Sequence, residues 1–191
     1  MIRAKNAIPP IPTACLALQP FLKNHPGKTR DDYDVEIAKI VLGENPDVVV
    51  LAGWMHVLGD GFLEAMTSDT LSDGSVSKTP VINLHPALPG AFDGTNAIRR
   101  AYDAFQRGEV TKTGVMVHRV VKEVDRGEPI VVREVVMKDG ESFEDFEARM
   151  HEVEWQVIVE ATAKVLDKAA HCNGEFAACT PTSPCSRLLA E

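Results

Sequence analysis

Asn83, His85 and Asp125 are the residues whose types and spacing are best suited to chemistry. Asn83 and His85 lie in the segment VINLHPALPG, Val81 to Gly90, whose apolar start is followed by two prolines. Because proline cannot continue a central strand ladder, a strand must end here. Residues two apart in a strand point to the same side, so Asn83 and His85 can face one pocket. An amide can stabilise an oxyanion and an imidazole can move a proton near neutral pH, which favours carbonyl chemistry.

Each of these residues also has an ordinary structural interpretation. Asn83 could satisfy a loop backbone, and His85 could be a hydrogen-bonded core histidine. Asp125 lies in KEVDRGEP, where Asp before Arg-Gly commonly closes a turn. The residue types alone therefore leave both interpretations open.

Helices and strands are predicted to alternate along the chain. Strands are expected where β-branched and apolar residues run together, and helices where apolar residues recur every three or four positions. The predicted strands are 47–53, 80–84, 115–121 and 129–137; the predicted helices are 29–43, 61–66, 95–108, with Thr95 as cap, and 142–168, with Ser142 and Asp145 as a capping box.

This alternation predicts an α/β fold with a mainly parallel, Rossmann-like sheet flanked by helices. The strands at 115–121 and 129–137 are joined by a short segment and should form an antiparallel hairpin towards one edge. Ligands of such sheets bind at the carboxyl ends of the strands, where segments 53–58 and 85–90 both begin. The polar segment 68–78 is expected to be a surface connection.

Several motifs together resemble phosphoribosylglycinamide formyltransferase, the folate-dependent enzyme family of purine synthesis. The resemblance covers about residues 1–166 and implies the formyltransferase fold. It also implies transfer of a formyl group from 10-formyltetrahydrofolate to the amine of glycinamide ribonucleotide, without a metal. The matching segments are DVVVLAGWMHVL, INLHPALPG, GVMVHRVVKEVDRGEPIVVREVVM and SFEDFEARMHEVEW.

The resemblance gives roles to the three residues. It implies that Asn83 donates to the formyl oxygen, that His85 assists as an imidazolium, and that Asp125 pairs with His85 and relays protons through water. A carboxylate next to His85 is expected to raise the pKa of the imidazole and keep it protonated at neutral pH. His118 could orient the neighbouring strand, contact the formyl region, or be purely structural.

The binding residues are likewise implied by the resemblance. One wall of the folate pocket comes from Met55, His56, Val57 and Leu58, although many relatives carry Arg at the position of His56. The other wall comes from Val120, Val121 and Val124. Gly53 and Glu154 are expected to bind the nucleotide, with a solvated helix face as the alternative for Glu154. Trp155 is expected to lie in the core.

The length and composition of the chain limit the other classes of protein to which it could belong. The chain has 191 residues, which suggests one domain, expected over 1–170, followed by a flexible tail over 171–191. A net charge of −8 argues against a broad nucleic-acid surface. No apolar run approaches the roughly 20 residues of a membrane span, and no signal peptide is evident, so a cytoplasmic location is expected. Neither oligomeric state nor a metal site is indicated by the sequence.

Relatives begin with a strand and a glycine-rich phosphate loop, whereas this sequence has no glycine before Gly27. The N-terminal phosphate-loop segment is therefore expected to be missing. This leaves open a catalytically impaired, folate-binding remnant, or another formyltetrahydrofolate-dependent transferase or hydrolase. A metallohydrolase using His85, His118 and Asp125 is a further alternative. A nicotinamide dehydrogenase and a serine hydrolase are disfavoured, because GxGxxG and GxSxG are absent.

Overall fold

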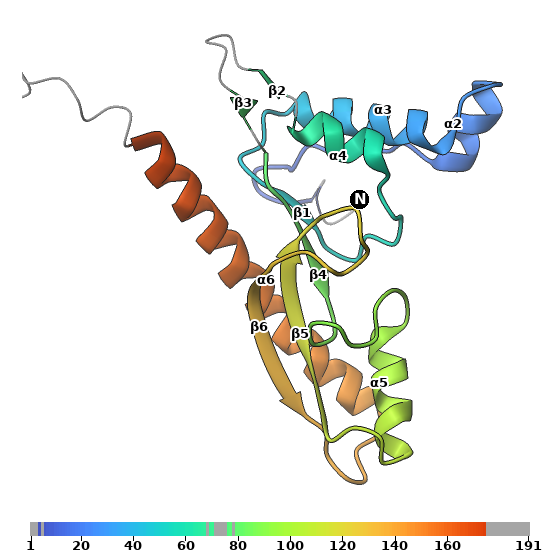
Figure 1. The fold of residues 1–191 in the computed structure, drawn as a ribbon, viewed down its shortest axis with the longest axis vertical. Coiled ribbons are helices and arrows are strands. Elements are labelled where there is room, and N and C mark those ends of the chain that lie inside the picture. Colours follow the sequence, from blue (N-terminus) through green and yellow to red (C-terminus); the bar gives the residue numbers. More distant parts are fainter. Residues whose placement is uncertain (1–3, 5, 68, 71–75, 78, 175–191) are drawn as a thin grey trace, which may run out of the picture.

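The computed structural model describes residues 4, 6–67, 69–70, 76–77 and 79–174 (Figure 1). Its helices and strands alternate as expected. In chain order they are α2 (Leu18–Asn24), α3 (Arg30–Leu42), β1 (Val49–Leu51), α4 (Asp60–Thr67), β2 (Asp69–Thr70), β3 (Val76–Ser77), β4 (Val81–His85), α5 (Ala97–Gln106), β5 (Lys112–Arg119), β6 (Pro129–Val136) and α6 (Phe143–Gly174).

The main sheet has the strand order β1-β4-β5-β6. β1 and β4 are parallel, whereas β4 pairs with β5 and β5 with β6 in antiparallel fashion. The α/β class and the antiparallel hairpin at one edge are therefore confirmed, in a mixed sheet whose described parallel part is the β1–β4 pair. The register sets Asn83 of β4 between Leu51 of β1 and His118 of β5. A second, two-stranded sheet of β2 and β3 lies within the predicted surface connection.

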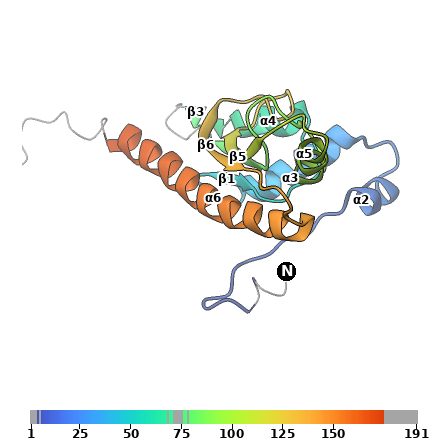
Figure 2. The ribbon, with the colours of Figure 1, turned by 90° about the horizontal axis from the view of Figure 1, so that it is seen from below.

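Helix α6 covers one face of the sheet (Figures 1 and 2). Its apolar side chains pack on the β-branched side chains of β5 and β6, which explains why both surfaces are apolar in sequence. The buried members of this core are Ile82, Val115, Val117, Val131, Val135, Met137, Phe146, Met150, Val157, Ala161 and Val165. A smaller core joins α3, α4 and β4 through Ala38, Leu58, Phe62, Met66 and Val81.

The helix starts agree only partly with the sequence signals. Thr29 and Asp32 form a reciprocal capping box at α3, and the Ser142 hydroxyl accepts a hydrogen bond from the Asp145 amide at 3.1 Å. The prediction that Thr95 caps α5 was wrong. Asn96 occupies the cap position, in a left-handed conformation and without a side-chain cap bond. Instead, the Arg100 guanidinium donates to backbone carbonyls of this turn, including that of Asp93 at 2.8 Å.

Helix α6 differs from the prediction at two places. It continues to Gly174, beyond the expected end at Lys168, so residues 171–174 of the expected tail are helical and 175–191 lie outside the described residues. The expectation that Trp155 belongs to the core was wrong, because its side chain is 68% exposed. Trp155 is five residues from Met150 and two from Val157, so helical geometry directs it away from the buried stripe that contains them. None of the helices in the described ranges is long and apolar enough to cross a membrane.

Phe146 and Trp155 provide a test of this packing within one helix. Phe146→Ala should lower the free energy of unfolding by about 3–5 kcal/mol, because Phe146 is completely buried and its removal leaves a cavity. Trp155→Ala should change it by less than about 0.5 kcal/mol, because the side chain lies in solvent. Urea unfolding followed by circular dichroism measures both values. Equal losses in the two variants would contradict the placement of α6.

Candidate active site

The candidate site is a pocket of about 390 Å³ at the carboxyl ends of β1 and β4. Because these strands are parallel, the loops that follow them emerge at the same edge of the sheet. Gly53 turns the chain after β1 with φ = +65°, a conformation that glycine adopts without strain. The loop between β5 and β6 and one face of α6 complete the lining.

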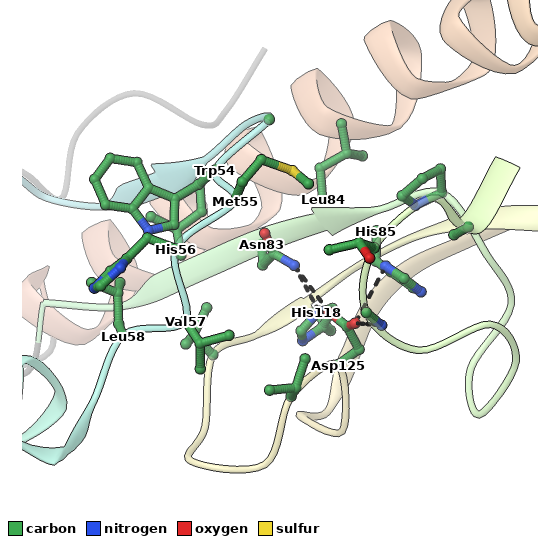
Figure 3. Close-up of a pocket in the computed structure, with 18 of the residues that line it drawn as sticks. Trp54, Met55, His56, Val57, Leu58, Asn83, Leu84, His85, His118 and Asp125 are labelled. Atoms are coloured by element: carbon green, nitrogen blue, oxygen red, sulfur yellow. Dashed lines mark hydrogen bonds and ion pairs between the residues drawn. The ribbon is translucent and has the colours of Figure 1, made fainter. Parts of the chain in front are cut away.

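Asn83, His118 and Asp125 meet in this pocket (Figure 3). The Asn83 side-chain nitrogen lies 3.2 Å from His118 Nε2 and 3.3 Å from Asp125 Oδ1. The sheet register produces the first contact, since Asn83 and His118 are direct cross-strand partners. The predicted proximity of Asn83 and Asp125 is therefore present, and His118 belongs to the same cluster.

The hydrogen bonds determine the proton positions in this cluster. His118 Nδ1 lies 2.8 Å from the Arg119 carbonyl, which can only accept, so Nδ1 carries the proton. Nε2 of a neutral His118 then accepts from the Asn83 amide. Both hydrogens of that amide are thus directed at acceptors, His118 Nε2 and Asp125 Oδ1. A substrate oxygen that binds Asn83 must replace one of these two acceptors.

His85 is buried, with 3% of its surface exposed, and its Nδ1 lies 3.5 Å from Asp125 Oδ2. Burial lowers the pKa of His85 below its ordinary value of 6.5, and the opposing effect of the Asp125 charge is smaller. The expectation that Asp125 keeps His85 protonated at neutral pH was therefore wrong for the unliganded site. Within the described part of the chain, the buried Nε2 atom has no hydrogen-bond partner. Because Nε2 is enclosed by protein, the ring nitrogen that faces the polar groups of the site is Nδ1, next to Asp125.

Asp125 is held in an unusual backbone conformation, with φ = +56°. Its Oδ2 accepts a hydrogen bond from the Gly94 amide at 2.8 Å. Two residues later, Gly127 packs so closely on β5 that an added Cβ would lie 1.7 Å from the Arg119 carbonyl oxygen. Non-glycine residues with positive φ cost energy and persist where the surroundings impose them, often at functional sites. The loop therefore holds the carboxylate between Asn83 and His85.

Every binding residue expected from the sequence lines this pocket. The expected folate walls form two sides, and many of their apolar side chains are open to solvent, which is the state expected of a binding surface. These residues are Met55, His56, Val57 and Leu58 on one side and Val120, Val121 and Val124 on the other, with Gly53 and Glu154 also in the lining. His56 differs from its neighbours, because its ring is turned toward Asp34 of α3 at 2.5 Å.

The face of α6 that closes the pocket carries Glu147, His151 and Glu154. The Glu154 side chain is only 12% exposed and lies 2.5 Å from His151 Nδ1, so it is not part of a freely solvated helix face. His151 and Glu147 were not among the binding residues expected from the sequence. Their signal was the spacing, since His151 lies three residues before Glu154 and Glu147 four residues before His151, which places all three on one side of a helix.

The described residues include no cluster of three or more His, Cys, Asp or Glu side chains arranged to hold a metal ion. His85 and His118 flank Asp125, and the Asn83 amide lies within hydrogen-bond distance of both His118 Nε2 and Asp125 Oδ1.

Comparison with known proteins agrees with this geometry. Residues 3–162 match the family described as Formyl transferase, so the chain belongs to the formyl transferase family. Within the family it is similar to phosphoribosylglycinamide formyltransferase of Schizosaccharomyces pombe, with 41% identity over 157 residues, covering 82% of this chain and 72% of the relative. It is equally similar to the Saccharomyces cerevisiae protein of that name, with 41% identity, covering 83% and 74%.

A solved structure of phosphoribosylglycinamide formyltransferase from Bacillus halodurans superimposes with a TM-score of 0.68 at 28% identity, covering 88% of this chain and 75% of that one. The formyltransferase fold expected from the sequence is thereby confirmed.

The protonation state of His85 can be measured directly. In an NMR titration of the histidine rings, His85 should titrate below pH 6.5, because burial disfavours its cation. Asp125→Asn should lower this pKa further, because it removes the charge that favours protonation. Asp139→Asn, which changes an exposed carboxylate away from the pocket, should leave it unchanged. A His85 pKa above 6.5 would contradict the dominance of burial.

The same shift has a consequence for stability. The unfolded chain binds a proton at His85 more readily than the folded chain, so acidification from pH 7.5 to 5.5 should destabilise the fold. His85→Gln should lose less stability over this interval than the parent chain, as measured by urea unfolding at each pH. An identical pH dependence in both would show that His85 does not titrate differently on folding.

Proposed function

We propose that this chain transfers the formyl group of 10-formyltetrahydrofolate to the amine of glycinamide ribonucleotide, a step of purine biosynthesis. The observation that carries this proposal is the convergence of Asn83, His85 and Asp125 in one pocket at the end of β4. The names of the most similar relatives support the same reaction. A cytoplasmic location is part of the proposal.

The site must stabilise one developing charge and transfer two protons. Attack of an amine on an N-formyl group produces a tetrahedral species with a negative oxygen and a positive nitrogen. The oxygen must be stabilised, the new ammonium must lose a proton, and the leaving folate nitrogen must gain one. No change of oxidation state is involved, and the proton released by the amine balances the proton taken up by the leaving nitrogen.

The site residues divide this work as follows. The Asn83 amide donates to the oxyanion once the substrate oxygen displaces one of its present acceptors. Neutral His85 takes up the ammonium proton at Nδ1, the ring nitrogen on the side of Asp125, and returns it to the leaving nitrogen. Asp125 faces His85 Nδ1 and stabilises the imidazolium while it exists.

The pocket has separate places for the two substrates. We assign the folate to the apolar walls, which carry the exposed side chains of Met55, Val57, Val121 and Val124. We assign the nucleotide to the side formed by Gly53 and α6, where Glu154 offers acceptors for hydroxyl groups. His151 holds the Glu154 carboxylate in place.

Asn83→Ala should reduce kcat at least about 10²-fold, because it removes a donor to the transition-state oxygen. Asp125→Asn should also reduce kcat, and it tests the charge alone, because asparagine tolerates the left-handed backbone of this position. The matched control is Asp139→Asn, which should retain parental activity. Initial rates of formyl transfer, measured by tetrahydrofolate release with both substrates present, provide the comparison.

The acceptor dependence of the reaction separates a transferase from a hydrolase. Tetrahydrofolate release should require glycinamide ribonucleotide and should yield one formylated nucleotide per folate released. Equal release without the nucleotide would identify a hydrolase and overturn the proposal. Binding of folate without turnover in the presence of both substrates would overturn it in favour of a non-catalytic folate-binding protein.

A further inference from the structure

Asp34 is a completely buried carboxylate outside the catalytic cluster. It lies on α3, and its two oxygens hold two points of the loop that follows β1. Oδ1 lies 2.5 Å from His56 Nε2, and Oδ2 accepts the Gly59 amide at 2.7 Å. Buried carboxylates are rare unless they are paired, so this one requires a structural or functional reason.

The protonation of His56 follows from its partners. Arg30 Nη2 lies 2.9 Å from His56 Nδ1, and a guanidinium can only donate, so Nδ1 must accept. Nε2 therefore carries the proton and donates it to Asp34. Both ring nitrogens are engaged by the protein, so the His56 side chain has no remaining polar atom for a ligand.

The contacts fasten the pocket wall to the start of α3. His56 and Gly59 flank Val57 and Leu58, which line the pocket, and Arg30 also donates to the Val57 carbonyl at 3.3 Å. The loop lies so close to α3 that a Cβ at Gly59 would meet the Asp34 carboxylate at 3.2 Å. The wall is thus held at both His56 and Gly59 by the Asp34 side chain.

Aromatic contacts extend this attachment on both sides of His56. Its ring lies 5.4 Å from the ring of Tyr33 on α3, in an edge-to-face arrangement. On the other side it lies 6.3 Å from the ring of Trp54, which is itself part of the pocket lining. Figure 3 shows Trp54 and His56 together at one end of the pocket, away from Asn83 and Asp125.

We propose that Asp34 and His56 are positioning residues that hold the loop Trp54–Gly59 in the shape that binds the folate co-substrate. This inference rests on the proposed function, because it names the folate as the ligand of this wall. Neither residue takes part in proton transfer. Their loss should weaken folate binding through the loop, while the catalytic cluster and the nucleotide side keep their geometry.

The first test separates a positioning role from a catalytic one. Asp34→Asn should raise KM for 10-formyltetrahydrofolate about tenfold or more, because an amide cannot accept from both His56 and Gly59. The value of kcat and the KM for glycinamide ribonucleotide should change less than about twofold. Glu36→Gln, on the same helix but paired with Lys39 in solvent, should behave as the parent chain. An unchanged folate KM, or a loss confined to kcat, would overturn the inference.

Two replacements of His56 test the hydrogen bonds themselves. His56→Phe retains a ring between Tyr33 and Trp54 but cannot bond to Asp34 or Arg30, and should raise the folate KM as Asp34→Asn does. His56→Gln can donate to Asp34 and accept from Arg30, and should lie closer to the parent value. If both variants bind folate equally well, the bonds to Asp34 and Arg30 do not position the wall.

Tryptophan fluorescence in the absence of ligand reports on the loop directly. It therefore remains informative for a variant whose folate affinity is reduced. The chain has two tryptophans, so Trp155→Phe leaves Trp54 as the single fluorescent reporter in the loop. In that background Asp34→Asn should increase acrylamide quenching of Trp54 emission, while Glu36→Gln should not. Unchanged quenching would overturn the inference even if the proposed function holds. A parent chain that binds no folate in isothermal titration would instead overturn the proposed function, and the inference with it.

Discussion

The Asp125 carboxylate is the interaction on which the rest of the site depends. It lies in a mostly buried position, 9% exposed, where an ionised group is costly unless hydrogen bonds replace its water. The Gly94 amide and the Asn83 amide provide these bonds, and His85 and His118 both approach within 3.5 Å. One charge therefore aligns the side chains of two strands and a loop, and the loop accepts a strained backbone at Asp125 to place it there.

The sheet makes this arrangement possible. Because β4 and β5 pair with Asn83 opposite His118, a slip of one strand by one residue would turn its side chain away from that of its partner. The buried core under α6 fixes the register, since Ile82 of β4 and Val117 of β5 must point into it. The same packing that stabilises the fold thus sets the geometry of the site, and the loops after β1 and β5 complete it.

Much of the site could be predicted from the sequence, because it depends on local rules. The two-residue spacing in a strand places Asn83 and His85 together, and each family motif adds residues that line the same pocket. The pKa of His85 could not be predicted, since it depends on how deeply the fold buries the ring. The burial of Asp34 and its contacts with His56 and Gly59 could not be predicted either. An aspartate in the first turns of a helix is usually solvated or interacts with the helix start. Trp155 was misplaced because the expectation followed its apolar character rather than its spacing, which sets it two residues from Val157 and so on the other face of α6.

The pH dependence of kcat/KM tests most directly whether a neutral His85 carries out the proton transfer. After correction for ionisation of the substrate amine, kcat/KM for formyl transfer should rise with pH and reach a plateau, with an apparent pKa below 6.5. This result would show that the active form of the free enzyme carries an unprotonated imidazole. A decline of kcat/KM as pH rises through 6.5 and above would show that the reaction needs the imidazolium, and would contradict the account.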